Sequence, residues 1–213
     1  MKDFDWTMVG MRYVDEKGES RQVRSVQDDM VAKDAHAADV LLCEVPQMGW
    51  VTNKLYKASI VQEQGLSFME DSHIHEDRVF NFGYIQYVNS FVMKSEVTYD
   101  YLINTGSLTH NKYDSPEMFI CTANTIDGIL RAGKLGEHMA QYAARFMVKF
   151  YLHAFGCCVV YPYGILPLKR RCRIGMHLVR SFFGSVLLRK YFFLTLKFLL
   201  KDLFRYIKEY LHL

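Results

Sequence analysis

The residues with the clearest chemical potential are two adjacent acids, Glu76 and Asp77, which lie between a polar loop and an apolar repeat. Apolar side chains recur three to four positions apart over residues 79–91, which predicts a helix that begins at this pair. Negative charge is favoured in a first helical turn by the helix dipole and by unsatisfied backbone N–H groups. The pair is therefore either a helix cap, the commoner use of such residues, or two acids aimed at a ligand.

Segments before this helix would position it. Residues 1–31 predict a pair of strands around a turn at residues 15–18. Asp28 or Asp29 is a plausible cap for a helix that extends to Leu42, because alanines fill its interior.

A further helix is predicted directly before the acidic pair, and strands are predicted after it. Thr52 or Asn53 would cap that helix, and Gly65 would end it. Residues 91–93 and 97–103 are rich in β-branched and aromatic side chains, which predicts two strands. The acidic helix would therefore lie between elements of a mixed α/β domain.

The chain continues into helices. Ser115 supplies a hydroxyl cap and Pro116 occupies the position where its missing N–H costs nothing, so a helix is predicted to about Leu130. Apolar spacing predicts a second packing helix over residues 139–151. Residues 156–167 are interrupted by Gly and Pro and predict a connector.

An ordered series of short motifs covers about residues 40–110. It comprises Trp50-Val51-Thr52-Asn53-Lys54-Leu55-Tyr56-Lys57, Ile60, Gly65-Leu66-Ser67-Phe68, His75-Glu76-Asp77-Arg78-Val79-Phe80, Tyr99-Asp100-Tyr101 and Gly106-Ser107-Leu108-Thr109. This series resembles the second, acceptor-side half of the family 2 glycosyltransferases. The resemblance implies a partial GT-A-like sheet with flanking helices, followed by a C-terminal helical region.

The resemblance also implies a reaction and its site. Members of the family transfer a sugar from a nucleotide-sugar donor to an acceptor with inversion, and surface polysaccharide synthesis is the expected setting. Asp77 takes the place of the family's general base, and Glu76 would position it or bond to the acceptor. The expected acceptor-binding residues are Trp50, whose ring could stack on a saccharide, Asn53 and Lys54, which could bond hydroxyls, and His75.

The part of the family that binds the nucleotide has no counterpart in this sequence. A divalent cation (Mg or Mn) is expected for the full-length family enzyme, but its ligands are not found here, and no residue is assigned to a metal. Asp3 and Asp5 have the outline of an Asp-x-Asp motif, yet solvated strand-end acids are the commoner case. His73 and His75 alternate without a third ligand nearby. We therefore expect that this polypeptide alone does not catalyse sugar transfer.

Composition limits the compartment and the partners. The net charge is +3, but from residue 169 onward the balance is about +9, so the preceding part is acidic. Five cysteines, an odd number without zinc-ligand spacing, predict reduced thiols. No apolar signal region follows Met1, which favours a cytoplasmic location, with peripheral binding to the inner membrane face as an extension.

The basic tail has two interpretations. Its cations fall within one quadrant of a helix, and the expected membrane-facing residues are Lys190, Lys197, Lys201, Arg205 and Lys208. The other interpretation is a bundle helix that packs a broad apolar face. Nucleic acid is not an expected partner, because the tail's aromatic residues lie apart from its cations.

Three regions follow from these patterns. They are the acceptor-side half (1–112), packing helices and connector (113–168) and the basic amphipathic tail (169–213). The alternative to a glycosyltransferase is a non-catalytic interaction protein that uses the tail to bind a membrane surface.

Overall fold

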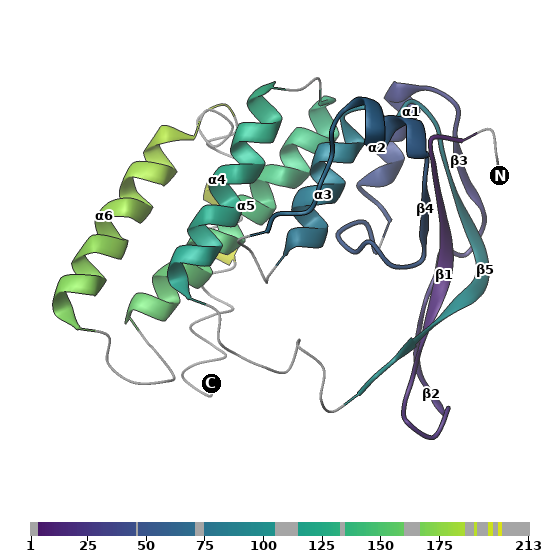
Figure 1. Ribbon diagram of the computed structural model, residues 1–213, viewed down its shortest axis with the longest axis horizontal. Helices are drawn as coiled ribbons and strands as arrows, with labels where there is room; N and C mark the ends of the chain where they lie inside the picture. Colours follow the sequence, from purple (N-terminus) through teal and green to yellow (C-terminus); the bar gives the residue numbers. More distant parts are fainter. Residues whose placement is uncertain are drawn as a thin grey trace. The chain divides into compact units, whose positions relative to one another are not determined.

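The computed structural model of this chain describes residues 4–45, 47–70, 75–104, 115–132, 135–159, 167–185, 190, 196–197 and 200–201, with the backbone alone for residues 157–159. The chain divides into two compact units, Met1–Tyr113 and Asp114–Leu213. The described residues of the first unit, which we call unit 1, form a sheet and three helices. In the second, unit 2, the elements formed by the described residues are helices (Figure 1).

The sheet of unit 1 is built around its first strand. Its strands are β1 (Trp6–Val14), β2 (Ser20–Arg24), β3 (Met30–Ala32), β4 (Lys54–Tyr56) and β5 (Phe91–Leu102). β1 pairs along its length with β5 in parallel. Its other edge pairs antiparallel, first with β4 and then with β2, and β3 pairs with the far edge of β5.

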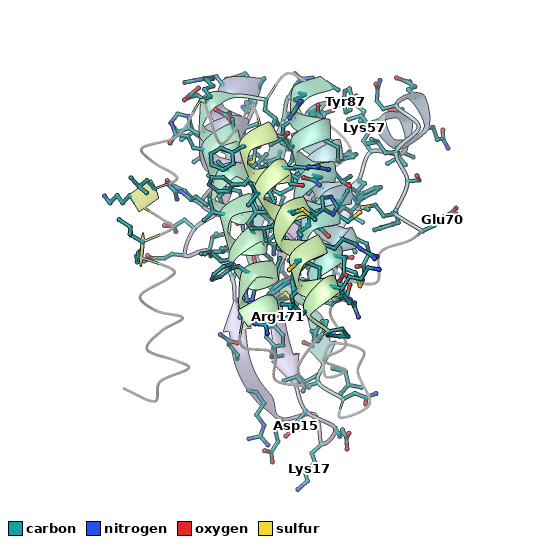
Figure 2. The ribbon with its side chains drawn as sticks, turned by 90° about the vertical axis from the view of Figure 1, so that its left-hand side faces the viewer. Asp15, Lys17, Lys57, Glu70, Tyr87 and Arg171 are labelled. Carbon is teal, nitrogen blue, oxygen red and sulfur yellow. The ribbon has the colours of Figure 1, made fainter. Side chains whose placement is uncertain are left out.

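The β1–β2 hairpin confirms the predicted strand pair. Asp15 stabilises the turn, because its Oδ1 accepts hydrogen bonds from the backbone N–H groups of Lys17 and Glu19, each 2.9 Å long. Gly18 takes the left-handed conformation (φ 78°) that glycine adopts without strain. In Figure 2, Asp15 and Lys17 lie at the tip of this hairpin, and Lys57 and Tyr87 lie at the opposite end of unit 1.

Figure 1 draws the three helices in the described part of unit 1 on one side of the sheet. They are α1 (Ala35–Leu42), α2 (Ala58–Glu63) and α3 (Glu76–Ile85). The core between them and the sheet is apolar and contains the fully buried side chains of Trp6, Met8, Phe82, Tyr84 and Phe91. Every residue of α3 from Val79 to Ile85 is buried, so α3 is the central helix of the unit.

Two predicted helices begin later than expected. The helix assigned a cap at Asp28 or Asp29 begins at Ala35, where Asp34 accepts a 2.8 Å hydrogen bond from Ala37 N. The preceding residues pair with β5 instead, and Asp29 binds Lys94 at 2.6 Å. A strand partner elsewhere in the chain therefore overrode the local helix propensity.

The predicted helix at residues 52–65 is also shorter. Lys54–Tyr56 is strand β4, because it pairs with β1, and α2 begins only at Ala58. Asn53 does not cap a helix; its φ of 58° is left-handed. Gly65 does follow the helix end in a left-handed conformation, as predicted.

The two strands predicted at residues 91–93 and 97–103 form the single strand β5. Opposite β1 its register shifts between the pairs Met8–Met93 and Gly10–Val97, so the intervening residues form an irregularity rather than a loop. The interruption in the apolar pattern corresponds to this shift.

The described part of unit 2 contains α4 (Pro116–Ala132), α5 (Glu137–Val159) and α6 (Leu168–Gly184). The predicted start of α4 is confirmed, because Ser115 Oγ accepts a hydrogen bond from Met118 N. The predicted connector at residues 156–167 begins too early, since α5 continues to Val159. Within the described helices, none combines the length and the apolar character that crossing a bilayer requires.

Candidate functional site

The acidic pair lies where the sequence predicts it, in the first turn of α3. His75 precedes the helix in a left-handed conformation (φ 62°), and its carbonyl accepts hydrogen bonds from Arg78 N and Val79 N. Asp77 lines an open cavity of about 830 Å³. The lining residues all belong to unit 1 and are Met11, Tyr13, Arg21, Gln22, Arg24, Trp50, Thr52, Asp77, Tyr101 and Ile103.

A loop that we call the Trp50 loop (residues 47–54) is fastened to α3 beside this cavity. The Asn81 side chain is fully buried and donates from Nδ2 to Met48 O (2.7 Å) and to Trp50 O (2.9 Å). One helical turn earlier, Asp77 Oδ2 accepts a 3.3 Å hydrogen bond from Val51 N. Because residues four apart share a helix face, the same face of α3 holds both the acid and the loop.

Asn81 is itself fixed from the sheet side. Its Oδ1 accepts a 2.7 Å hydrogen bond from the hydroxyl of Tyr56 in β4. Burial raises the pKa of Tyr56, so the phenol stays a neutral donor at physiological pH. These three hydrogen bonds of the Asn81 amide therefore position the Trp50 loop between α3 and β4.

Lys54 closes the Trp50 loop on itself. Its Nζ donates to Gln47 O (2.7 Å), Thr52 O (3.2 Å) and Asn53 Oδ1 (2.9 Å). Burial lowers the pKa of Lys54 to about 7, although the negative charge of Asp77 acts in the opposite direction. A protonated amine has three N–H donors for these three acceptors, and a neutral amine has only two.

Asn53 links the loop to the sheet. Its Nδ2 donates to Val9 O in β1, and its own carbonyl accepts from Val9 N at 3.1 Å. Asn53 and Lys54 thus hold the loop through hydrogen bonds within unit 1. Their predicted contact with acceptor hydroxyls stays a prediction.

The wall opposite the helix end is aromatic and carries a cation. Tyr13 of β1 lies 5.3 Å from the ring of Tyr101 and 6.3 Å from that of Trp50. The Arg24 guanidinium carbon lies 5.4 Å above Tyr13 and 4.9 Å above Trp50. Aromatic faces and a planar cation form a surface suited to a ring that carries both C–H groups and polar substituents.

The two arginines of this wall differ in their partners. Arg21 pairs with Asp15 and with Glu19. Arg24 contacts two aromatic rings, and among the residues the structure describes no carboxylate pairs with it. Its charge is therefore available to an anionic group in the cavity.

Sequence reasoning missed Tyr13, Arg24 and the structural role of Asn81. The hairpin register pairs Met11 with Arg24, and alternation puts Met11 and Tyr13 on one face of β1. The predicted strand pair therefore contained the signal for Tyr13 and Arg24. Asn81 could have been noticed as a polar residue four positions after Asp77, in the middle of an apolar helix face.

The other predicted site residues do not line the cavity or are not described. Glu76 and His75 adjoin Asp77 along the chain, but they are not among the residues that line the cavity. His73 and residues 106–109 lie outside the described residues. In unit 2, Lys197 and Lys201 are exposed and Lys190 pairs with Glu137 at 3.2 Å, whereas Arg205 and Lys208 are not described.

Asp5 has a structural role in unit 1. It binds Lys57 Nζ at 2.9 Å and the backbone N–H groups of Asn89 and Ser90 at 3.0 and 3.2 Å. Burial alone would raise the pKa of Asp5, but these hydrogen bonds bring it below its usual value. Among the described residues, no group of three or more His, Cys, Asp or Glu side chains is placed to hold a metal ion.

Comparisons with known proteins identify the fold. No protein-family model matches the chain, and no curated protein matches it. Among solved structures, Staphylococcus aureus TarS 1-349 in complex with UDP-GlcNAc is similar, with a TM-score of 0.59 and 16% sequence identity. That similarity covers 84% of this chain and 49% of TarS.

Two other TarS structures agree. The complex with UDP has a TM-score of 0.55 at 15% identity, and TarS 1-349 without a named ligand has 0.54 at 14%. Both cover 84% of this chain and 48% of TarS, so the chain spans about half the length of these structures. The observed strands and helices confirm the predicted mixed α/β class, and the fold of the chain is similar to that of TarS.

Proposed function

We propose that this chain is the acceptor-side part of a glycosyltransferase that transfers a sugar from a nucleotide-sugar donor to a saccharide acceptor. The observation that carries the proposal is the position of Asp77. Its carboxylate is held by Val51 N–H on the wall of a cavity of about 830 Å³ whose lining includes the aromatic residues Tyr13, Trp50 and Tyr101 and the basic residues Arg21 and Arg24. The glycosyltransferase-like fold supports the same reaction class, and so does the nucleotide-sugar bound to TarS.

The proposed chemistry is a single displacement with inversion. An acceptor hydroxyl oxygen forms a bond to the anomeric carbon while the bond from that carbon to the nucleotide diphosphate breaks. The hydroxyl proton passes to Asp77, which acts as general base; such a base contributes typically about 10² to 10⁴ in rate. The hydrogen bond from Val51 N supports this role, because it orients the carboxylate without occupying both oxygens.

The acceptor would lie against the aromatic wall. The rings of Trp50 and Tyr13 can stack on the C–H face of a saccharide, and Arg24 can bond a negatively charged substituent. Glu76 and His75, beside Asp77 at the helix start, would contact the acceptor's outer hydroxyls. The negative charge of Asp77 favours the protonated form of Lys54.

The donor side requires groups beyond those described here. A divalent cation would help the diphosphate to leave, but the described residues offer no cluster of ligands for it. The proposal therefore assigns no cation ligand to this chain. Surface polysaccharide synthesis on the inner face of the membrane remains the proposed setting. The second candidate function is a non-catalytic protein that binds the membrane surface, and the exposed apolar side chains of α6 favour it.

Saccharide binding by this chain tests the acceptor assignment directly. Saturation-transfer NMR with a panel of neutral and acidic oligosaccharides should detect binding to the wild-type chain. Trp50→Ala should abolish that signal, because it removes the largest aromatic surface of the cavity, whereas the control Tyr87→Ala, an exposed residue at the other end of unit 1, should retain it. Equal binding by wild type and Trp50→Ala would contradict the proposed acceptor site.

Transfer activity tests the reaction. The protein that contains these residues together with its donor-binding part should release UDP from a UDP-sugar when a saccharide acceptor is present. Substantial sugar transfer by the Asp77→Asn variant would show that Asp77 is not the general base.

A further inference from the structure

We infer that helix α6 docks on an anionic lipid surface through an exposed apolar stripe, which we call the α6 stripe. Its residues are Leu168, Cys172, Met176, Val179 and Phe183. The spacing of four, four, three and four positions, at about 100° per residue, places all five within about 80° of the helix circumference. The exposed fractions are 74% for Leu168, 59% for Met176, 53% for Val179 and 70% for Phe183, and Cys172 is also exposed.

The α6 stripe is not the face that packs within unit 2. Ile174 is buried on the opposite side, and Ser181 accepts a 3.0 Å hydrogen bond from Asn124 of α4. The ring of Phe182 lies edge-on to Tyr151 of α5, with 5.8 Å between the ring centroids. Packing against α4 and α5 therefore fixes the rotation of α6 and leaves the side chains of the stripe exposed. Figure 1 shows α6 beside α4 and α5.

The end of α6 is fixed as well. Ser185 Oγ donates a 2.9 Å hydrogen bond to Asp127, and Arg131 donates to Gly184 O at 2.7 Å. Both partners lie on α4. The stripe is thus presented by a helix held at its face and its C-terminal end, which limits the ordering cost of binding a surface.

Charge identifies the partner. Lys169, Arg173 and Arg180 lie at about 100° to 140° on the same wheel, next to the stripe, and all three are exposed. No acidic residue occurs in α6, and Arg170 already binds Glu117 of α4. A second copy of α6 laid on this one would bring like charges together, whereas an anionic lipid surface complements them.

The dimensions of α6 agree with lying in the membrane surface. Seventeen residues give a helix of about 25 Å, and its cations exclude burial in the hydrocarbon core. A helix with one apolar stripe and adjacent cations settles at the boundary between headgroups and acyl chains. Figure 2 labels Arg171, which marks the first turns of this helix.

Vesicle sedimentation of the full chain tests the inference. Wild type should bind vesicles of phosphatidylglycerol and phosphatidylcholine, bind pure phosphatidylcholine much less, and be released by added salt. Arg173→Gln with Arg180→Gln should lower the partition coefficient more than about tenfold, since each cation contributes about fivefold. Met176→Gln with Phe183→Gln should lower it by about tenfold or more.

A matched control uses an exposed apolar residue outside the stripe. Leu55→Gln, on β4 of unit 1, changes a side chain of similar exposure and should bind like wild type. Circular dichroism of every variant should show unchanged helix content, because the substituted side chains are exposed. Equal vesicle binding by wild type and the Met176→Gln, Phe183→Gln variant would overturn the inference, and so would absence of wild-type binding.

A reporter in the stripe distinguishes insertion from simple charge attraction. The emission of Phe183→Trp should shift to shorter wavelength with the anionic vesicles, and brominated lipid should quench it. An unshifted spectrum would overturn insertion of the stripe. Dimerisation that Phe183→Gln abolishes, in the absence of lipid, would assign the stripe to a second copy instead and would also overturn the inference.

Discussion

The cavity of unit 1 and the outer face of α6 depart from ordinary packing in opposite ways. Beside the cavity, polar side chains are buried: Asn81 is fully buried, and Lys54 is enclosed by three acceptors. On α6, large apolar side chains are exposed. Burying polar groups is tolerated only when they are hydrogen-bonded, and exposed apolar stripes mark interaction surfaces.

The comparison separates two kinds of functional surface. The cavity wall needs a network of internal bonds because it must hold a carboxylate in one orientation. The α6 stripe needs none, because a lipid surface adapts to it. Substitutions beside the cavity should therefore affect both folding and function, and substitutions in the stripe should affect binding alone.

The largest effect is expected for Asp77→Asn, which should lower sugar transfer by about 10² to 10⁴ because the amide cannot accept the proton. The substitution keeps the size of the side chain, so the cavity should keep its shape. Initial rates of UDP release by the protein with its donor-binding part measure the loss. Asp100→Asn, which affects only an exposed ion pair with Arg12, is the control and should retain activity.

Asn81→Ala should lower the free energy of unfolding by about 2 to 3 kcal/mol. It leaves the hydroxyl of Tyr56 and the carbonyls of Met48 and Trp50 without their partner in a buried place. Urea titration followed by fluorescence measures the change. Asn89→Ala, at an exposed position, should shift it by less than about 0.5 kcal/mol; an equal shift in the two variants would show that the Trp50 loop is not held through Asn81.

Lys54 should make stability depend on pH. Because the pKa falls to about 7 on folding, the unfolded chain binds more protons than the folded one between pH 7 and the ordinary value of 10.5. Stability should therefore rise with pH across this window, by about 1.4 kcal/mol per unit at most, and this rise should be absent in Lys54→Met. Urea titrations of wild type and Lys54→Met at pH 7 and 9 measure the difference. An equal change in the free energy of unfolding between the two pH values in both proteins would contradict the prediction.

Arg24→Gln should weaken binding of acidic oligosaccharides about fivefold, and binding of neutral ones less, because the lost charge faces the cavity. Isothermal titration gives both affinities. Arg12→Gln is the matched control, since Arg12 alternates with Tyr13 on β1 and so faces the other side of the sheet. Equal losses for acidic and neutral ligands would contradict an anion contact.

Phe183→Gln should change the free energy of unfolding by less than about 0.5 kcal/mol, because the ring is largely exposed. Urea titrations of Phe183→Gln and Asn81→Ala, measured side by side, compare the stability contribution of the α6 stripe with that of the network beside the cavity. A loss as large as that of Asn81→Ala would show that the α6 stripe is part of the folded core.

The start of α3 could be predicted because its signals are local. The acids, the apolar spacing after them and the requirement of the helix dipole lie within one short segment. The same holds for the hairpin at Asp15 and for the cap at Ser115. In each case neighbours along the chain determine the structure.

The elements that were wrongly predicted depend on distant partners. The local sequence of Lys54–Tyr56 predicts a helix, but the segment is a strand because it pairs with the edge of β1. Asp29 is a residue type that often caps the start of a helix, yet here it binds Lys94, which is 65 positions away. The wall made by Tyr13 and Arg24 could have been inferred from the predicted hairpin once its register was known. The contacts of Asn81 with Met48, Trp50 and Tyr56 join residues 25 to 33 positions apart, so the local pattern marked the residue but not its partners.

The parallel pairing of β1 with β5 joins Trp6 to Phe91, and everything between them must be synthesised before the two strands can meet. Tyr101, the last aromatic residue of the cavity wall, lies near the end of β5. On the ribosome, the cavity therefore cannot exist until translation has passed that residue and its strand has left the exit tunnel. Until then β1 has an unpaired edge, and a chaperone that shields this edge would have its greatest effect on newly made chains.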